Sequence, residues 1–172
     1  VNLPSVHPAI DDRYGVDRLR MGSTAETVAE KYGVSRTSQD EYAPRSHRRA
    51  ADATDEGRFD DEIVPVETDQ GVVTGDEGIR RDTSLEALAD LSPAFAAEGT
   101  VTAGNASQIS DGAAGVVVTS RAFAADHGCD VLAEVGAHEV AGVDPTVMGI
   151  GPVPAVRGLC ERTGRDPADY DL

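Results

Sequence analysis

Thr100–Gly115 reads TVTAGNASQISDGAAG and runs directly into Val116, Val117 and Val118. Gly, Ala and hydroxyl residues dominate the stretch, so its backbone rather than bulky side chains faces whatever lies beside it. Asn105 and Asp111 form turns, and their side chains can hydrogen-bond the backbone of the loop. Two interpretations stay open: a loop that binds a ligand, and a tight connection that needs positive φ angles. The valine run after it predicts a buried strand.

The composition describes an acidic protein that is poor in aromatic residues. The 172 residues carry a net charge of −16, and aromatic residues make up 4%. Lys31 is the single lysine among fifteen Lys and Arg residues. This charge disfavours nucleic-acid binding, because phosphates would be repelled. It is typical of the solvated surface of a salt-adapted cytoplasmic protein, with an ordinary acidic protein as the alternative.

No segment that crosses a membrane or directs secretion is predicted. No apolar run reaches about 18 residues, and no charged-then-apolar leader opens the chain. The chain starts at Val1 rather than Met, and Leu172 begins an apolar segment, so we expect both ends to be cut.

Short helices and loops are predicted before residue 110. Residues 1–19 are expected to be loop. Ser23 and Glu26 form a capping box for a helix that ends at Gly33, and Ser35 caps the next helix, whose main run covers residues 39–53 with a kink at Pro44. The remaining predictions are an edge strand over Glu62–Val66 and a second capping box, Thr83 to Glu86, before a short helix.

Helices and strands alternate after Val118. The predicted elements are a helix over Arg121–His127, a strand over Val131–Val140, a helix that opens at Pro152 and ends before Gly164, and a strand that starts at Tyr170. Such alternation indicates an α/β protein with layered helices and sheet.

The chain shows no obvious nucleophile beside a base. Its histidines are interpreted as structural or solvated, and its two cysteines as small core residues without a disulfide or zinc spacing; these residues are His7, His47, His127, His138, Cys129 and Cys160. The H-E-x-x-H, G-x-S-x-G and Walker motifs are absent from the sequence. From the residues alone, the sequence predicts an acidic α/β protein with a backbone-rich loop, for which ligand binding and a tight connection both stay open.

A series of motifs in order resembles the thiolase family over about residues 20 to 172. They are Met21-Gly-Ser-Thr-Ala-Glu26, Val34-Ser-Arg36, Gln39-Asp40, Gly57-Arg-Phe59 with Glu62-Ile-Val-Pro65, Thr83-x-Leu85, Leu91-x-Pro-Ala-Phe95, Gly99-Thr-Val-Thr-Ala-Gly-Asn-Ala-Ser107, Asp111-Gly-Ala-Ala114, Val143-Asp-Pro145, Met148-Gly-x-Gly-Pro-x-Pro-Ala155 and Asp169-x-Asp-Leu172. So many ordered matches are far more specific than one motif.

The resemblance implies an incomplete thiolase-like layered αβαβα fold of the α/β class, with a loop-and-helix excursion before the core strands. It implies that residues 1–110 are the CoA-covering loop region of the N-terminal thiolase domain, that 111–128 end the core of that domain, and that 129–172 start the C-terminal domain. The implied activity is that of an acetyl-CoA C-acyltransferase, which transfers an acyl group between 3-oxoacyl-CoA, or acetoacetyl-CoA, and CoA through a cysteine thioester. The reactive cysteine would lie outside this chain, so the chain alone is expected to be inactive. The alternative is a non-catalytic module that binds CoA or an acyl carrier.

The resemblance also assigns substrate contacts, residue by residue. Ser107 resembles the serine that hydrogen-bonds the pantetheine arm, with Ala103, Gly104 and Ala106 giving close backbone approach. Arg80, or its neighbour Arg81, resembles a cation near the nucleotide end of CoA. The remaining implied contacts are Met21 and Met148 at the acyl end and Phe95 against CoA, for which core packing is the alternative.

Two residues depart from the family pattern. Arg20 stands where many relatives carry His, which puts substrate preference in doubt, and Pro44 interrupts a usually continuous helix. The expected partners are acyl-CoA and CoA, with CoA as a substrate and no further cofactor. The full-length protein is expected to be a cytoplasmic homo-oligomer, a dimer or tetramer, with a role in fatty acid metabolism.

Overall fold

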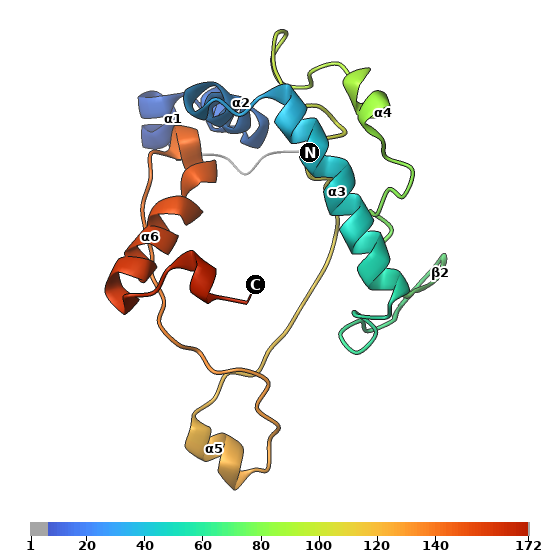
Figure 1. Ribbon diagram of the computed structural model, residues 1–172, viewed down its shortest axis with the longest axis vertical. Coiled ribbons are helices and arrows are strands. Elements are labelled where there is room, and N and C mark those ends of the chain that lie inside the picture. The colour runs from blue at the N-terminus through green and yellow to red at the C-terminus, as the bar shows by residue number, and fades with distance from the viewer. Residues whose placement is uncertain (1–6, 172) are drawn as a thin grey trace. The chain divides into compact units, whose positions relative to one another are not determined.

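The structure is a computed structural model that describes residues 7–171. The described chain forms two compact units, residues 7–109 with Asp144–Gly149, and residues 110–143 with 150–171. Figure 1 traces the chain and labels the α-helices and β2.

The first unit is built mainly from helices around small buried side chains. Its elements are α1 (Pro8–Tyr14), η1 (Val16–Leu19), α2 (Met21–Tyr32), α3 (Arg36–Asp55), β1 (Val66–Thr68), β2 (Gly71–Val73), α4 (Leu85–Ala89) and most of η2 (Pro145–Ile150). Helix α3 contacts α4, while η1 contacts both α1 and α2. The buried apolar side chains are Ala29, Ala43, Ala51, Leu88, Val101 and Val147. Alanine and valine thus supply most of the core of this unit.

The loop predicted over residues 1–19 is wrong for its described part, because residues 8–19 form α1 and η1. His7 caps α1, since its Nδ1 accepts the backbone N–H of Ala9 at 3.2 Å. Pro8 then stands in the first turn, where a missing N–H costs nothing. Residues 1–6 of the predicted loop lie outside the described residues.

Helix α2 begins two residues before the predicted capping box. It starts at Met21, and its N-cap Arg20 makes no side-chain cap bond. Glu26 does not reach back to Ser23, because its carboxylate accepts backbone N–H groups of the loop at residues 100–101 instead. The helix ends as predicted at Gly33, whose φ of 68° is a left-handed conformation that glycine adopts without strain.

Helix α3 is capped by Ser35, as predicted, and runs from Arg36 to Asp55 through Pro44. The kink expected at Pro44 stays a prediction. The second capping box is wrong by one residue, since Ser84 rather than Thr83 caps α4 and accepts the N–H of Ala87 at 3.2 Å.

The edge strand predicted over Glu62–Val66 is displaced toward the C-terminus. The N–H of Ile63 bonds the carbonyl of Phe59 at 3.1 Å, so a turn occupies the first part of the predicted strand. The strand itself is β1, which pairs antiparallel with β2, with Val66 opposite Val73.

The second unit contains α5 (Arg121–Asp126), α6 (Pro152–Thr163) and η3 (Pro167–Asp169). Helices α5 and α6 match the predicted helices, and α6 ends before Gly164. The strands expected at Val116–Val118 and Val131–Val140 are absent from the described residues, as is a strand over residues 170–171; Leu172 lies outside them. A strand forms only where a neighbouring backbone takes its hydrogen bonds, and no described segment pairs with these. Val117 is accordingly 91% exposed.

In the part of the chain that the structure describes, no helix has both the length and the apolar character needed to cross a bilayer.

Candidate functional site

The glycine- and alanine-rich loop lies against α3 and encloses a pocket of about 280 Å³. The loop supplies residues 103–108, α3 supplies four residues, and one comes from the segment before α4. The lining residues outside the loop are Tyr42, Ala43, Ser46, His47 and Arg80. All lining residues are uncharged or cationic, in a chain whose net charge is −16. The pocket therefore suits an anionic ligand with hydrogen-bonding groups.

Five of the eight predicted substrate contacts line this pocket: Arg80, Ala103, Gly104, Ala106 and Ser107. A larger hollow of about 770 Å³ is formed by residues 68–77 alone, which are the β1–β2 hairpin and the turn after it. Because one continuous segment of ten residues forms that hollow, whereas three separate segments form the pocket at α3, the pocket at α3 is the candidate site.

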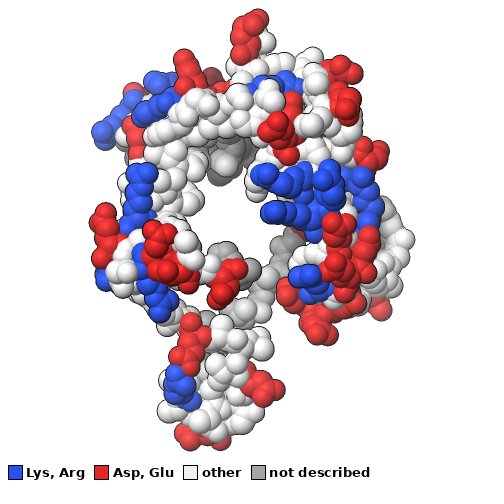
Figure 2. Space-filling model, in the orientation of Figure 1, with Lys and Arg blue, Asp and Glu red and all other residues white. Residues whose placement is uncertain are grey.

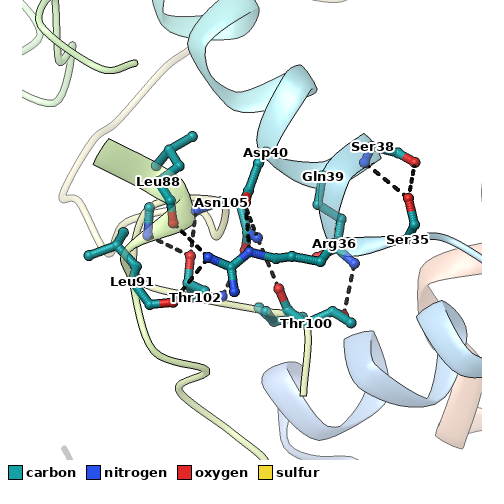
Figure 3. A network of polar contacts seen from close by, with 12 residues as sticks. Ser35, Arg36, Ser38, Gln39, Asp40, Leu88, Leu91, Thr100, Thr102 and Asn105 are labelled. Carbon is teal, nitrogen blue, oxygen red and sulfur yellow. Dashed lines mark hydrogen bonds and ion pairs between the residues drawn. The ribbon is translucent and has the colours of Figure 1, made fainter. Parts of the chain in front are cut away.

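Asn105 anchors the loop to α3 through its side chain (Figure 3). Its amide nitrogen donates to Asp40 Oδ1 at 2.9 Å and to the carbonyl of Thr100 at 3.0 Å. Its amide oxygen accepts the N–H of Thr102 at 2.8 Å. The hydroxyl of Thr102 accepts the N–H of Gly104 at 3.2 Å, and Thr102 is fully buried. The loop conformation is thus set by specific hydrogen bonds.

Arg36 joins the same network to the C-terminal end of α4. Its Nε donates to Asp40 Oδ2 at 2.7 Å. One terminal nitrogen donates to the carbonyls of Leu88 at 2.6 Å and Leu91 at 3.0 Å. The side chain of Asp40 is only 8% exposed, so removing this charge from water is costly unless the carboxylate is paired and fully hydrogen-bonded. Arg36 and Asn105 together meet that requirement.

Glu26 of α2 holds the start of the loop. Its carboxylate accepts the N–H of Thr100 at 2.9 and 3.0 Å, the hydroxyl of Thr100 at 3.0 Å and the N–H of Val101 at 2.9 Å. Gln39 of α3 also donates to the Thr100 hydroxyl, at 2.9 Å. Hydrogen bonds that an ionised carboxylate accepts are shorter and stronger than hydrogen bonds between two neutral groups. Two helices therefore fix residues 100–101.

Gly104 is required by packing as well as by the pocket. A methyl group added there would meet the side chains of Leu88 and Leu91. Gly104 is a buried residue of the loop, and its missing side chain lets the loop lie close to Leu88 and Leu91.

His47 positions the backbone of Arg80. Its Nδ1 accepts the N–H of Arg80 at 3.1 Å, which leaves the other ring nitrogen as the donor. The neighbouring Arg81 makes a different contact: it donates two hydrogen bonds to the carboxylate of Asp55, at 2.7 and 2.8 Å. These bonds hold the pKa of the Asp55 carboxyl below its usual value. The structure thus gives the two adjacent arginines different surroundings, with Arg80 at the pocket.

The other three predicted contacts lie near α2 and do not line the pocket. Met21 is the first residue of α2 and is 73% exposed. The ring of Phe95 packs against Gly22, the residue after Met21. A methyl group added at Gly22 would overlap the Phe95 ring. Met148 is half-buried in η2, and its neighbour Gly149 lies beside Val28 of α2.

The polar anchors were largely missed from sequence, although Asn105 was expected to tie down the loop. Asp40 carried a usable signal, since it shares a helical face with Ala43 and Ala51, which are buried. A carboxylate on such a face needs a cation and hydrogen-bond donors. Arg36, four residues earlier, was the available cation.

Comparison with known proteins identifies related chains. The model of the thiolase N-terminal domain matches residues 8–122. An acetyl-CoA acetyltransferase of Paracoccus denitrificans is 47% identical over 156 residues, which are 88% of this chain and 40% of that protein. The crystal structure of the Bacillus anthracis acetyl-CoA acetyltransferase matches with a TM-score of 0.84 at 40% identity, covering 100% of this chain and 45% of the other. The human mitochondrial 3-ketoacyl-CoA thiolase, solved in complex with CoA, matches with a TM-score of 0.83 at 43% identity, covering 88% of this chain and 38% of the other. These likenesses indicate a partial α/β fold, and the chain spans less than half the length of each of these proteins.

Proposed function

Because this chain belongs to the thiolase family, we propose that the protein containing it is an acetyl-CoA C-acyltransferase. It would transfer an acyl group between 3-oxoacyl-CoA, or acetoacetyl-CoA, and free CoA. A cysteine thiolate would take the acyl group as a thioester, and CoA would then accept it from that thioester. We place this cysteine outside the present chain, whose own Cys129 and Cys160 match no catalytic position of the family.

The observation that carries the proposal is the pocket at α3. It gathers Arg80, Ala103, Gly104, Ala106 and Ser107 and has no acidic lining residue. A CoA thioester presents amide groups along its pantetheine arm and phosphates at its nucleotide end, so small residues, hydroxyls and cations are the groups that would bind it.

Within the pocket, we assign Ser107 to the pantetheine arm and Arg80 to the nucleotide end. Among the residues that the structure describes, the exposed hydroxyl of Ser107 makes a single hydrogen bond, at 3.3 Å to the carbonyl of Gln108, next to it in sequence. It can therefore turn to a ligand without breaking a buried bond. Ala103 and Ala106 would let the pantetheine backbone approach closely.

Around α2, we assign Met21 and Met148 to the acyl end of the substrate and Phe95 to a contact with CoA. Met21 and Phe95 are more than half exposed. Apolar side chains that stay exposed beside a binding loop are candidates for ligand contact.

Our proposal extends to the domain organisation, the cellular compartment and the assembly of the protein. We infer that residues 1–110 belong to the CoA-covering region, that 111–128 close the N-terminal core and that 129–172 begin the C-terminal domain. We propose a cytoplasmic, salt-adapted enzyme of fatty acid metabolism that acts as a homo-oligomer, with CoA as substrate and no added cofactor. The charge of −16 supports salt adaptation.

The test uses the complete protein that contains this chain. Acetoacetyl-CoA and CoA should yield acetyl-CoA, measured by mass spectrometry. The Ser107→Ala variant should raise the Kd for CoA about fivefold, the equivalent of one hydrogen bond of about 1 kcal/mol. CoA binding without acyl transfer would instead favour a non-catalytic module that binds CoA or an acyl carrier. Absence of both binding and transfer would refute the proposed function.

A further inference from the structure

The arginines around the pocket differ in whether they have an acidic partner. Between residues 36 and 81, Arg36, Arg58 and Arg81 each form an ion pair with a carboxylate. Within the described residues 7–171, the other four arginines of this segment form none; they are Arg45, Arg48, Arg49 and Arg80, and all four are exposed. Figure 2 shows cationic side chains gathered over the middle of α3, where every basic residue other than His47 is an arginine. Unpaired cations are unexpected where acidic residues outnumber basic ones by two to one.

Two of these arginines, called the pocket-side arginines below, lie next to the edge of the α3 surface that lines the pocket, beside Tyr42. The guanidinium carbon of Arg45 lies 5.3 Å from the ring centroid of Tyr42, which lines the pocket. Arg49 follows Ser46, also a lining residue, by three positions and Tyr42 by seven, so the three share one helical face.

Arg48 has the same charge and exposure but a different direction. At about 100° per residue it lies about 120° from Tyr42 and about 160° from Ser46 around the helix axis. It therefore offers a control of the same charge that lies farther from Tyr42 and Ser46 than Arg45 and Arg49 do, although it neighbours Arg45 on the helix surface.

Nearby acidic residues do not neutralise the two pocket-side arginines. Glu41 precedes Arg45 by four positions and Asp52 follows Arg49 by three, spacings at which helical ion pairs form. Within the described part of the chain neither pair is made. The guanidinium groups thus keep their donors for another anion.

We propose that Arg45 and Arg49 form a cationic rim, together with Arg80, that binds the phosphate groups at the nucleotide end of CoA. The proposal rests on the proposed function and adds two residues of α3 to the site. Guanidinium groups bind phosphate oxygens through paired, charge-assisted hydrogen bonds. In a chain with a charge of −16, a local cationic rim would also offset the repulsion of a ligand that carries several negative charges.

The experiment measures the Kd for three ligands with the complete protein: CoA, dephospho-CoA, which lacks the 3′-phosphate, and pantetheine, which lacks every phosphate. The variants are Arg45→Ala, Arg49→Ala and Arg48→Ala, and circular dichroism confirms that each is folded. Arg45→Ala and Arg49→Ala should each raise the Kd for CoA about fivefold, the effect of losing one partly exposed charge contact. The Kd for pantetheine should change less than about twofold, and Arg48→Ala should change neither.

The salt dependence of the Kd for CoA provides a second readout. A variant that had merely lost packing would not change this salt dependence. The Kd of the wild-type protein for CoA should rise with salt more steeply than that of the Arg45→Ala or Arg49→Ala variant, because screening weakens exposed charge contacts. Equal losses for CoA and pantetheine, or an equal effect of Arg48→Ala, would overturn the cationic rim. If the wild-type protein transfers acyl groups and binds CoA but both pocket-side variants match it, only the rim fails. A wild-type protein that does not bind CoA would overturn the proposed function and the rim together.

Discussion

Replacing Asn105 by alanine should loosen the loop at residues 100–108 while the adjacent helices stay folded. The change removes the bonds to Asp40, to the Thr100 carbonyl and to the N–H of Thr102. The two neutral bonds are worth about 1 kcal/mol each, and the bond to the carboxylate about 2 kcal/mol. Local opening of the loop should therefore become easier by about 3–4 kcal/mol, a change on the order of several hundredfold in the opening equilibrium.

Hydrogen–deuterium exchange of the complete protein measures this opening directly. Amides over residues 100–106 should exchange on the order of several hundredfold faster in Asn105→Ala, in proportion to the opening equilibrium, while amides within α2 stay protected. Ser107→Ala is the matched control, because among the described residues its exposed hydroxyl bonds only the carbonyl of Gln108, at 3.3 Å. In this variant, exchange over residues 100–106 should change less than about threefold. If Asn105→Ala exchanged no faster than this control, the side-chain network would not be what holds the loop.

Three further changes test separate parts of the structure. Glu26→Gln keeps the size of the side chain but removes its charge, so exchange at Thr100 should accelerate about tenfold, as expected for weaker charge-assisted bonds; unchanged exchange would contradict this role. Gly104→Ala should lower stability by about 1–3 kcal/mol in a denaturant titration, because its methyl group meets two leucine side chains, and an unchanged midpoint would refute the close packing. The hydroxyl and backbone N–H of Thr146 hold the pKa of the Asp144 carboxyl below its usual value. These hydrogen bonds should therefore stabilise the fold at pH values above the unfolded pKa of about 3.9. Their contribution should disappear as the pH falls through the lower pKa of the folded state. An NMR titration should place the Asp144 midpoint higher in Thr146→Ala than in the wild type, and equal midpoints would exclude the hydroxyl as the cause.

Features decided by a few neighbouring residues could be predicted from sequence. Ser35 caps α3 because its hydroxyl is within reach of an N–H three residues on. Gly33 and Gly164 end α2 and α6 because both take left-handed φ angles. The loop after Thr100 was predicted to present its backbone, and residues 103–108 do line the pocket.

Features that depend on residues far apart in the sequence could not be predicted in this way. Ser23 and Glu26 have the spacing of a capping box, but the donors at Thr100 and Val101 compete for the same carboxylate and hold it. The spacing between Ser23 and Glu26 contains no information on a competing hydrogen-bond donor 74 residues away, at Thr100. The strand predicted at Val116–Val118 failed for a related reason, because alternation and β-branching describe a surface that suits a sheet but do not supply the neighbouring strand.

The anchoring of the loop by Glu26, Gln39 and Asp40 has a consequence for the thermodynamics of ligand binding. These contacts join residues 61 to 75 positions apart in sequence, so the conformational entropy of the loop is lost when the helices assemble. Ordering a backbone residue costs about 1–2 kcal/mol, and a ligand that meets an already rigid loop does not bear that cost. Association should then resemble the docking of two preformed surfaces, with a rate set by encounter rather than by loop closure.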